Sequence, residues 1–127
     1  MTGRTLLLLA AMLELGTGLA LMLNPAWVVR WLLGDDLTGS GPALGRVAGF
    51  GLLSFGVACW PVTLPTVPAI RGMLIFNALA TAFFAYLLFT SDEAGKLLLP
   101  ALLLHGLLTF LFAREWFRSK RAKGGRP

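Results

Sequence analysis

Four apolar segments, each about as long as a membrane is thick, follow one another along the chain. They cover residues 5–23, 43–60, 69–89 and 97–117. An α-helix needs ~20 residues to cross a hydrocarbon core ~30 Å thick. Helix is also the form that satisfies its own backbone groups in lipid. We therefore predict an all-α membrane protein whose four transmembrane helices form an up-and-down bundle. That bundle is expected to be one domain over residues 1–117, followed by a basic cytoplasmic tail at 118–127.

Composition excludes the common alternatives to a membrane protein. Hydrophobic residues make up 57% of the chain and charged residues 13%, whereas soluble domains carry about 25% charged residues. A soluble domain of this size could not bury so much apolar surface, and disordered segments are polar. The lone Cys59 excludes a disulfide framework and a cysteine metal cluster. The sequence also has no hydrolytic triad and no nucleotide-binding loop, so we expect no catalytic activity, no cofactor and no metal.

The distribution of Lys and Arg predicts the orientation. With four spans, both termini and the proline-rich turn after the second span share one side of the membrane. Eight basic residues fall on that side: Arg4, Arg71, Arg114, Arg118, Lys120, Arg121, Lys123 and Arg126. Three fall on the other: Arg30, Arg46 and Lys96. Basic loops stay cytoplasmic, so we expect both termini on the cytoplasmic side of the inner (plasma) membrane. The basic tail is expected to bind anionic lipid rather than nucleic acid.

A short apolar segment at residues 25–34 is too short to span. Trp27 and Trp31 are four residues apart and would share one helical face. This pattern predicts a short helix lying in the outer membrane interface. The alternative is an irregular loop folded over the mouth of the bundle. Trp60 and Trp116 would anchor the opposite interface.

Polar residues inside the spans are candidate functional residues, because burying them in lipid is costly. The rise per helical residue places Glu14 ~13 Å and His105 ~12 Å from the outer ends of their spans. Arg46 lies ~5–6 Å inside the second span, and its long side chain can reach further inward. Asn77 lies deeper in the third. We predict an intramembrane polar cluster of these four residues.

This cluster has two interpretations. It could form a pocket, open toward the outer leaflet, that carries a proton or binds a small polar headgroup. Alternatively, a Glu14–Arg46 ion pair with a hydrogen bond from His105 could fix the helix register, an effect of at most ~1–2 kcal/mol. A single histidine with no second histidine or cysteine to complete a site argues against a metal or haem ligand.

Small residues predict which helix faces pack closely. Gly45, Gly49 and Gly56 fall on one side of the second span. Such stripes let helix backbones approach each other, either within one bundle or in a dimer. We expect packing within the bundle.

Three segments resemble the DoxX-like group of small bacterial four-helix membrane proteins. They are residues 18–33 (GLALMLNPAWVVRWLL), residues 43–60 (ALGRVAGFGLLSFGVACW) and residues 69–86. The arginine followed by glycines at the start of the second span is the most characteristic feature. The resemblance implies a four-helix up-and-down bundle, and members of the group have been linked to membrane complexes and redox homeostasis. It transfers no catalytic residue.

Two functions remain open from the sequence. The first is an accessory or stabilising subunit of a membrane complex, with a lipid or quinone as candidate ligand. Its expected partners are membrane lipids and either other membrane subunits or a second copy of the chain. The alternative is a small proton-linked transporter or channel that uses Glu14.

Overall fold

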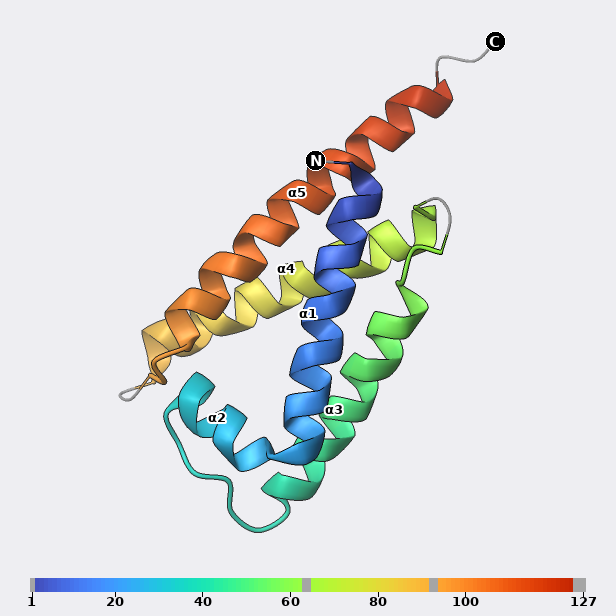
Figure 1. Ribbon diagram of the computed structural model, residues 1–127. Helices are drawn as coiled ribbons and strands as arrows, with labels where there is room; N and C mark the ends of the chain where they lie inside the picture. The colour runs from blue at the N-terminus through green and yellow to red at the C-terminus, as the bar shows by residue number, and fades with distance from the viewer. Residues whose placement is uncertain (1, 63–64, 92–93, 125–127) are drawn as a thin grey trace.

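The computed structural model describes residues 2–62, 65–91 and 94–124, and these residues fold into helices without any strand. The helices are α1 (Gly3–Leu23), α2 (Pro25–Leu33), α3 (Gly41–Ala58), α4 (Val67–Thr90) and α5 (Leu98–Gly124) (Figure 1). All of them except α2 are long and apolar enough to cross a membrane. The structure thus confirms an all-helical protein with four candidate membrane spans. Residues 92–93, before the last span, and residues 125–127 of the predicted tail lie outside the described residues.

Local sequence explains where the helices begin and end. Asn24 ends α1, and its side chain accepts a hydrogen bond from the Trp27 amide at 3.1 Å, so the same residue caps α2. Pro25 then occupies the first turn of α2, where a missing N–H costs nothing. Together they make the sharp corner between α1 and α2.

Two helix ends differ from the predicted spans. The second span was expected to reach Trp60, but α3 ends at Ala58. Pro61 is the physical reason, because a residue before proline is disfavoured in the helical region. The last helix continues past residue 117 to Gly124, since residues 118–123 contain neither proline nor glycine. The first part of the predicted tail is therefore a continuation of α5.

The four long helices associate as two pairs, with α1 packed on α3 and α4 packed on α5 (Figure 1). Glycines set the closeness of the first pair. A Cβ atom added to Gly49 would lie 2.7 Å from the Gly18 carbonyl oxygen, and one added to Gly56 would lie 3.0 Å from the Ala11 oxygen. The expectation that the glycine stripe packs within the molecule is confirmed.

The two pairs meet in one hydrophobic core near the end that holds the N-terminus (Figure 1). Its fully buried members include Leu7 and Ala10 of α1, Met73 of α4 and Phe112 of α5. Away from this core the contacts between the pairs become few, and α2 lies across the space between them. This divergence leaves room for the cavity described below.

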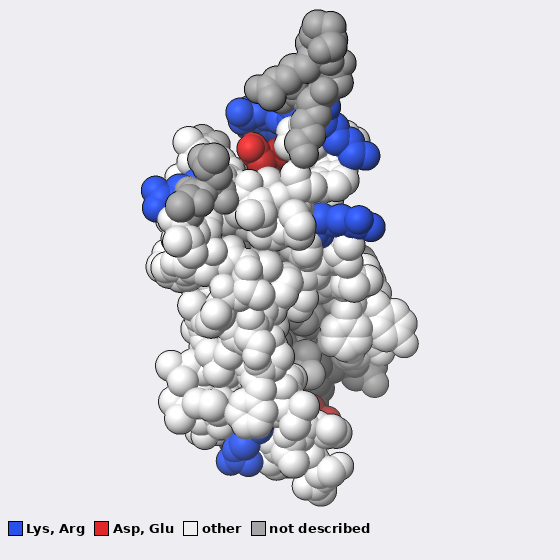
Figure 2. Space-filling model, turned by 90° about the vertical axis from the view of Figure 1, so that its right-hand side faces the viewer, with Lys and Arg blue, Asp and Glu red and all other residues white. Residues whose placement is uncertain are grey.

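Charge is concentrated at the ends of the molecule. In Figure 2 the Lys and Arg side chains gather toward the end where α5 continues, further basic atoms lie at the opposite end, and the middle of this face is uncharged. Lys120 lies over the Trp116 ring at 5.0 Å, and Lys96 lies over the Trp31 ring at 5.5 Å. An uncharged middle between charged ends is the pattern of a chain that crosses a bilayer.

Candidate functional site

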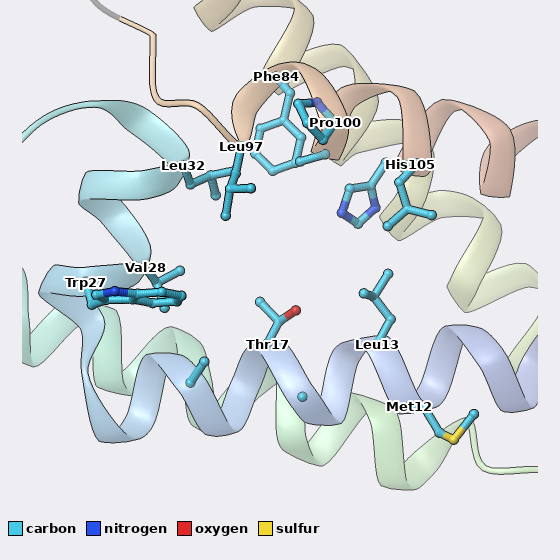
Figure 3. Close-up of a pocket in the computed structure, with 14 residues that line it drawn as sticks. Met12, Leu13, Thr17, Trp27, Val28, Leu32, Phe84, Leu97, Pro100 and His105 are labelled. Carbon is cyan, nitrogen blue, oxygen red and sulfur yellow. The ribbon is translucent and has the colours of Figure 1, made fainter.

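A cavity of about 510 Å³ lies where the two helix pairs diverge (Figure 3). Helix α1 forms one wall, α5 and α4 form the other, and α2 closes one end. The lining is almost entirely apolar: Met12, Leu13, Gly16, Thr17, Ala20, Trp27, Val28, Leu32, Phe84, Leu97, Pro100, Ala101, Leu104 and His105. Apart from the indole of Trp27, the polar side chains on this surface are Thr17 and His105.

Two of the residues that line the cavity from opposite walls are partly exposed. Met12 of α1 and Leu104 of α5 line it and are also exposed on the surface of their spans. These surfaces belong to the segments long and apolar enough to lie in a bilayer.

Helix α2 is held over the cavity by backbone contacts with the segment before α5. The Leu97 amide donates a hydrogen bond of 2.8 Å to the Trp31 carbonyl oxygen. Gly95 packs so tightly on the backbone of Trp31 and Leu32 that a Cβ atom there would overlap with it. The end wall of the cavity is thus fixed by main-chain geometry.

An ion pair fixes the other side of α2. Arg30 donates hydrogen bonds of 2.8 Å from Nε and from Nη2 to the two carboxylate oxygens of Asp36. Both side chains are exposed. The hydrogen bonds and charge of Arg30 hold the pKa of Asp36 below its usual value. The pair ties the end of α2 to the loop that follows it.

His105, which lines the cavity, is paired with a buried asparagine that does not. Asn77 of α4 is fully buried, and its Oδ1 lies 2.8 Å from Nδ1 of His105 on α5. Asn77 Nδ2 donates a hydrogen bond of 2.8 Å to the Met73 carbonyl oxygen. One turn further along both helices, the Thr81 and Thr109 hydroxyls lie 3.3 Å apart. Two matched polar pairs therefore join α4 to α5.

Aromatic rings hold the imidazole in place. The Phe76 ring stands edge-on to the His105 ring with centroids 6.0 Å apart, and the Phe84 ring lies at 5.5 Å. Phe84 also lines the cavity. The His105 ring is therefore confined between the amide of Asn77, two aromatic rings and the open cavity.

Glu14 is buried elsewhere, on the face of α1 that carries Ala10 and Ala11. Only 2% of its surface is exposed, and its Oε1 atom is sealed and makes no hydrogen bond to any described residue. It does not line the cavity, although its neighbours Leu13 and Thr17 do. Arg46 is exposed on α3, and no ion pair joins it to Glu14 within the described residues.

The structure thus brings together two of the four residues predicted as a cluster, His105 and Asn77, and leaves Glu14 and Arg46 separate. Sequence reasoning missed Thr109, one turn after His105. The available signal was the four-residue spacing from His105 to Thr109, which puts both on one face of the last span. No three His, Cys, Asp or Glu side chains gather to form a metal site in the part of the chain that the structure describes.

Comparison with models of known protein families, with curated proteins and with solved structures finds no match for this chain. The cavity, and His105 on its wall with its partner Asn77, are the features from which a function can be inferred. His105 and Asn77 lie within helices that could cross a membrane.

Proposed function

We propose that this chain is a small accessory protein of the bacterial inner membrane that binds a lipid or quinone in the cavity beneath α2 and performs no catalysis. One observation carries the proposal: an apolar cavity of about 510 Å³ lies between α1 and α5 beneath α2 and has His105 on its wall. Ligand pockets in proteins span about 300–1,000 Å³ and combine an apolar lining with a few polar groups. This cavity has both properties.

The proposal includes an orientation in the membrane. The four long helices cross it in alternating directions as an up-and-down bundle, and α2 lies in the outer interface with Trp27 and Trp31. Both termini are cytoplasmic, where the basic end of α5 attracts anionic lipid. The excess of Lys and Arg at that end supports this sidedness, and the three DoxX-like segments support the assignment to that bacterial group.

The accessory role rests on the apolar surfaces around the cavity. Besides the Trp27 indole, the described lining offers one imidazole and one hydroxyl on an otherwise apolar surface. Large side chains on α4, among them Leu79, Phe83 and Tyr86, are exposed. In a membrane this face can contact lipid, another subunit or a second copy. A pull-down in mild detergent, followed by mass spectrometry of proteins and lipids, tests the subunit role; a monodisperse homodimer without partners would count against it.

Ligand binding is tested by competitive photo-cross-linking. The purified protein, reconstituted in phosphatidylcholine vesicles, is labelled with a dodecanol that carries a diazirine on its chain, with and without excess unlabelled dodecanol. Cross-links at Met12, Leu13 or Leu104 that saturate and are displaced are expected. Cross-links spread evenly over all four long helices, without displacement, would contradict a specific cavity.

Two glycines give a matched pair of variants for this experiment. Nothing lies within 4 Å of a Cβ atom added to Gly16 or to Gly51, so at both positions a side chain can leave the backbone without a clash. Gly16 lines the cavity and Gly51 does not. Gly16→Leu is expected to abolish displaceable cross-linking at the cavity, whereas Gly51→Leu should leave it unchanged.

A second candidate function is favoured by one observation. Glu14 is a carboxyl group inside a predicted span whose Oε1 has no hydrogen-bond partner among the described residues. Intramembrane carboxyl groups of this kind are used for proton-linked transport. Vesicles containing a pH-sensitive dye test it: proton-coupled flux that Glu14→Gln abolishes, while the protein remains folded, would support a transporter. Absence of such flux in the unmodified protein would refute it.

A further inference from the structure

The orientation of the Asn77 amide is fixed by its neighbour on the same helix. A backbone carbonyl oxygen can only accept hydrogen bonds. The atom of Asn77 that lies 2.8 Å from the Met73 carbonyl oxygen must therefore be Nδ2, the donor. The other polar atom of this fully buried side chain is Oδ1, which lies 2.8 Å from His105 Nδ1. An amide oxygen can only accept a hydrogen bond.

This orientation determines which nitrogen of His105 carries the hydrogen. Oδ1 of Asn77 needs a donor, so Nδ1 of His105 donates to it across 2.8 Å. A neutral imidazole has one N–H and one lone pair. Nε2 is then left without a hydrogen and acts as an acceptor.

Nε2 is free to meet a ligand. It makes no hydrogen bond to the described residues. Among the described side chains, Glu14 Oε1 is the polar atom that is both shielded from solvent and without a hydrogen-bond partner. Because His105 Nε2 also has no partner but is not shielded in this way, it is accessible. His105 lines the cavity, and Figure 3 shows its ring across from Thr17 of α1. In this apolar cavity, the lone pair of Nε2 has no hydrogen-bond donor unless a ligand provides one.

We infer that the cavity selects an amphiphile that donates a hydrogen bond, meaning a hydroxyl group on an apolar chain or ring, over an otherwise equal molecule that can only accept. The inference rests on the proposed function of the cavity and specifies its ligand. A hydroxyl donates to His105 Nε2, and the ligand's apolar part fills the space between α1 and α2. An ether or carbonyl oxygen at the same place would put its own lone pair against that of Nε2, and neither would have a hydrogen-bond donor. Asn77 is the positioning residue, because it sets the polarity of the imidazole without touching the ligand.

Two sources can supply this chemistry: the free hydroxyl of a glyceride or fatty alcohol, and the hydroxyls of a quinol. The quinone carbonyls of the oxidised form cannot donate. Each source therefore offers a matched pair of probes. Dodecanol is compared with its methyl ether, and a decyl-benzoquinol, kept under argon, is compared with its quinone.

The first test reads the imidazole directly. The chain has a single histidine, so protein labelled with ¹⁵N-histidine gives one pair of ring-nitrogen resonances. In the full-length protein in vesicles, Nδ1 is expected in the protonated range and Nε2 in the unprotonated range. A hydrogen on Nε2 with Nδ1 unprotonated would overturn the inference.

The second test measures selectivity as displacement of the diazirine probe. In the unmodified protein, dodecanol should displace the probe at a concentration about tenfold lower than its methyl ether, the value expected for one hydrogen bond. The quinol should likewise exceed the quinone, and whichever donor binds more tightly identifies the source. For each competitor, the concentration compared is the amount that has entered the bilayer.

Variants on the neighbouring helices separate polarity from packing. Asn77→Leu removes the acceptor that fixes the ring, so the preference for donors should fall toward equality and the Nδ1 resonance should move. Thr109→Val removes a nearby hydroxyl of the same network but keeps the Asn77–His105 bond, and it should keep the preference. If Asn77→Leu does not fold, the nitrogen resonances and probe pairs of the unmodified protein still decide the matter.

The outcomes distinguish this inference from the proposed function. Equal displacement by donor and acceptor probes, with cross-links still saturable at the cavity, would overturn the inference and leave ligand binding intact. Absence of saturable displacement by any of the four probes would overturn the proposed function, and the inference with it. A donor preference that Gly16→Leu abolishes and Gly51→Leu preserves would support both.

Discussion

Replacing Gly49 by alanine tests whether the approach of α1 to α3 is set by glycine. The added Cβ atom would lie 2.7 Å from the Gly18 carbonyl oxygen and 2.9 Å from the Met22 amide nitrogen, and ordinary contacts begin at 3.4 Å. Both neighbours are backbone atoms, so no side chain can rotate away and the helices themselves must separate. Overpacking of this kind costs about 1–3 kcal/mol in the free energy of unfolding.

Gly51 provides the control on the same helix. A Cβ atom there meets nothing within 4 Å, so Gly51→Ala should leave stability unchanged or raise it by up to ~1 kcal/mol through helix propensity. Reversible unfolding in mixed micelles, followed by circular dichroism, measures both variants. If Gly49→Ala unfolds at the same denaturant concentration as Gly51→Ala, glycine at position 49 is not needed for the close approach of α1 and α3.

Three further predictions concern other parts of the fold. Because Arg30 lowers the pKa of Asp36, the ion pair is intact above that pKa and is lost as pH falls through it; carboxyl NMR titration should show the pKa rising toward ~3.9 in Arg30→Gln. Gly95→Ala should displace α2, measured as faster hydrogen exchange of its amides, because the new Cβ atom overlaps the α2 backbone. Phe112→Ala, at a residue 0% exposed, should cost on the order of 3 kcal/mol, whereas Phe110→Ala, at 65% exposed, should cost far less in the same unfolding assay.

The spans could be predicted from the sequence because length and hydropathy act locally. Each of the four long helices coincides with a predicted segment to within a few residues at its start, and the largest difference is the continuation of α5 to Gly124. Helix ends follow from local chemistry too, as the corner at Asn24 and Pro25 shows. These features depend on residues adjacent in the chain.

The site could be predicted only in part, because depth along a helix does not determine rotation about its axis. Glu14 and His105 were placed at nearly equal depth, yet Glu14 lies on the buried face of α1 with Ala10 and Ala11 while His105 faces Asn77 and the cavity. Rotation is set by which helices pair. The pairing of α1 with α3 depends on the contact of Gly18 with Gly49, residues far apart in sequence.

The same pairing explains why a cavity forms at all. Glycine brings α1 close to α3 along much of its length, and the polar pairs Asn77–His105 and Thr81–Thr109 join α4 to α5. The closest contacts are thus made within each pair of helices. The contacts between the pairs are concentrated in the core around Phe112. The space beyond that core stays open where Gly16 and Ala20 line it on α1, opposite Leu104 and His105 of α5. The cavity is therefore a consequence of two helix pairs that make their closest contacts internally and meet at one end.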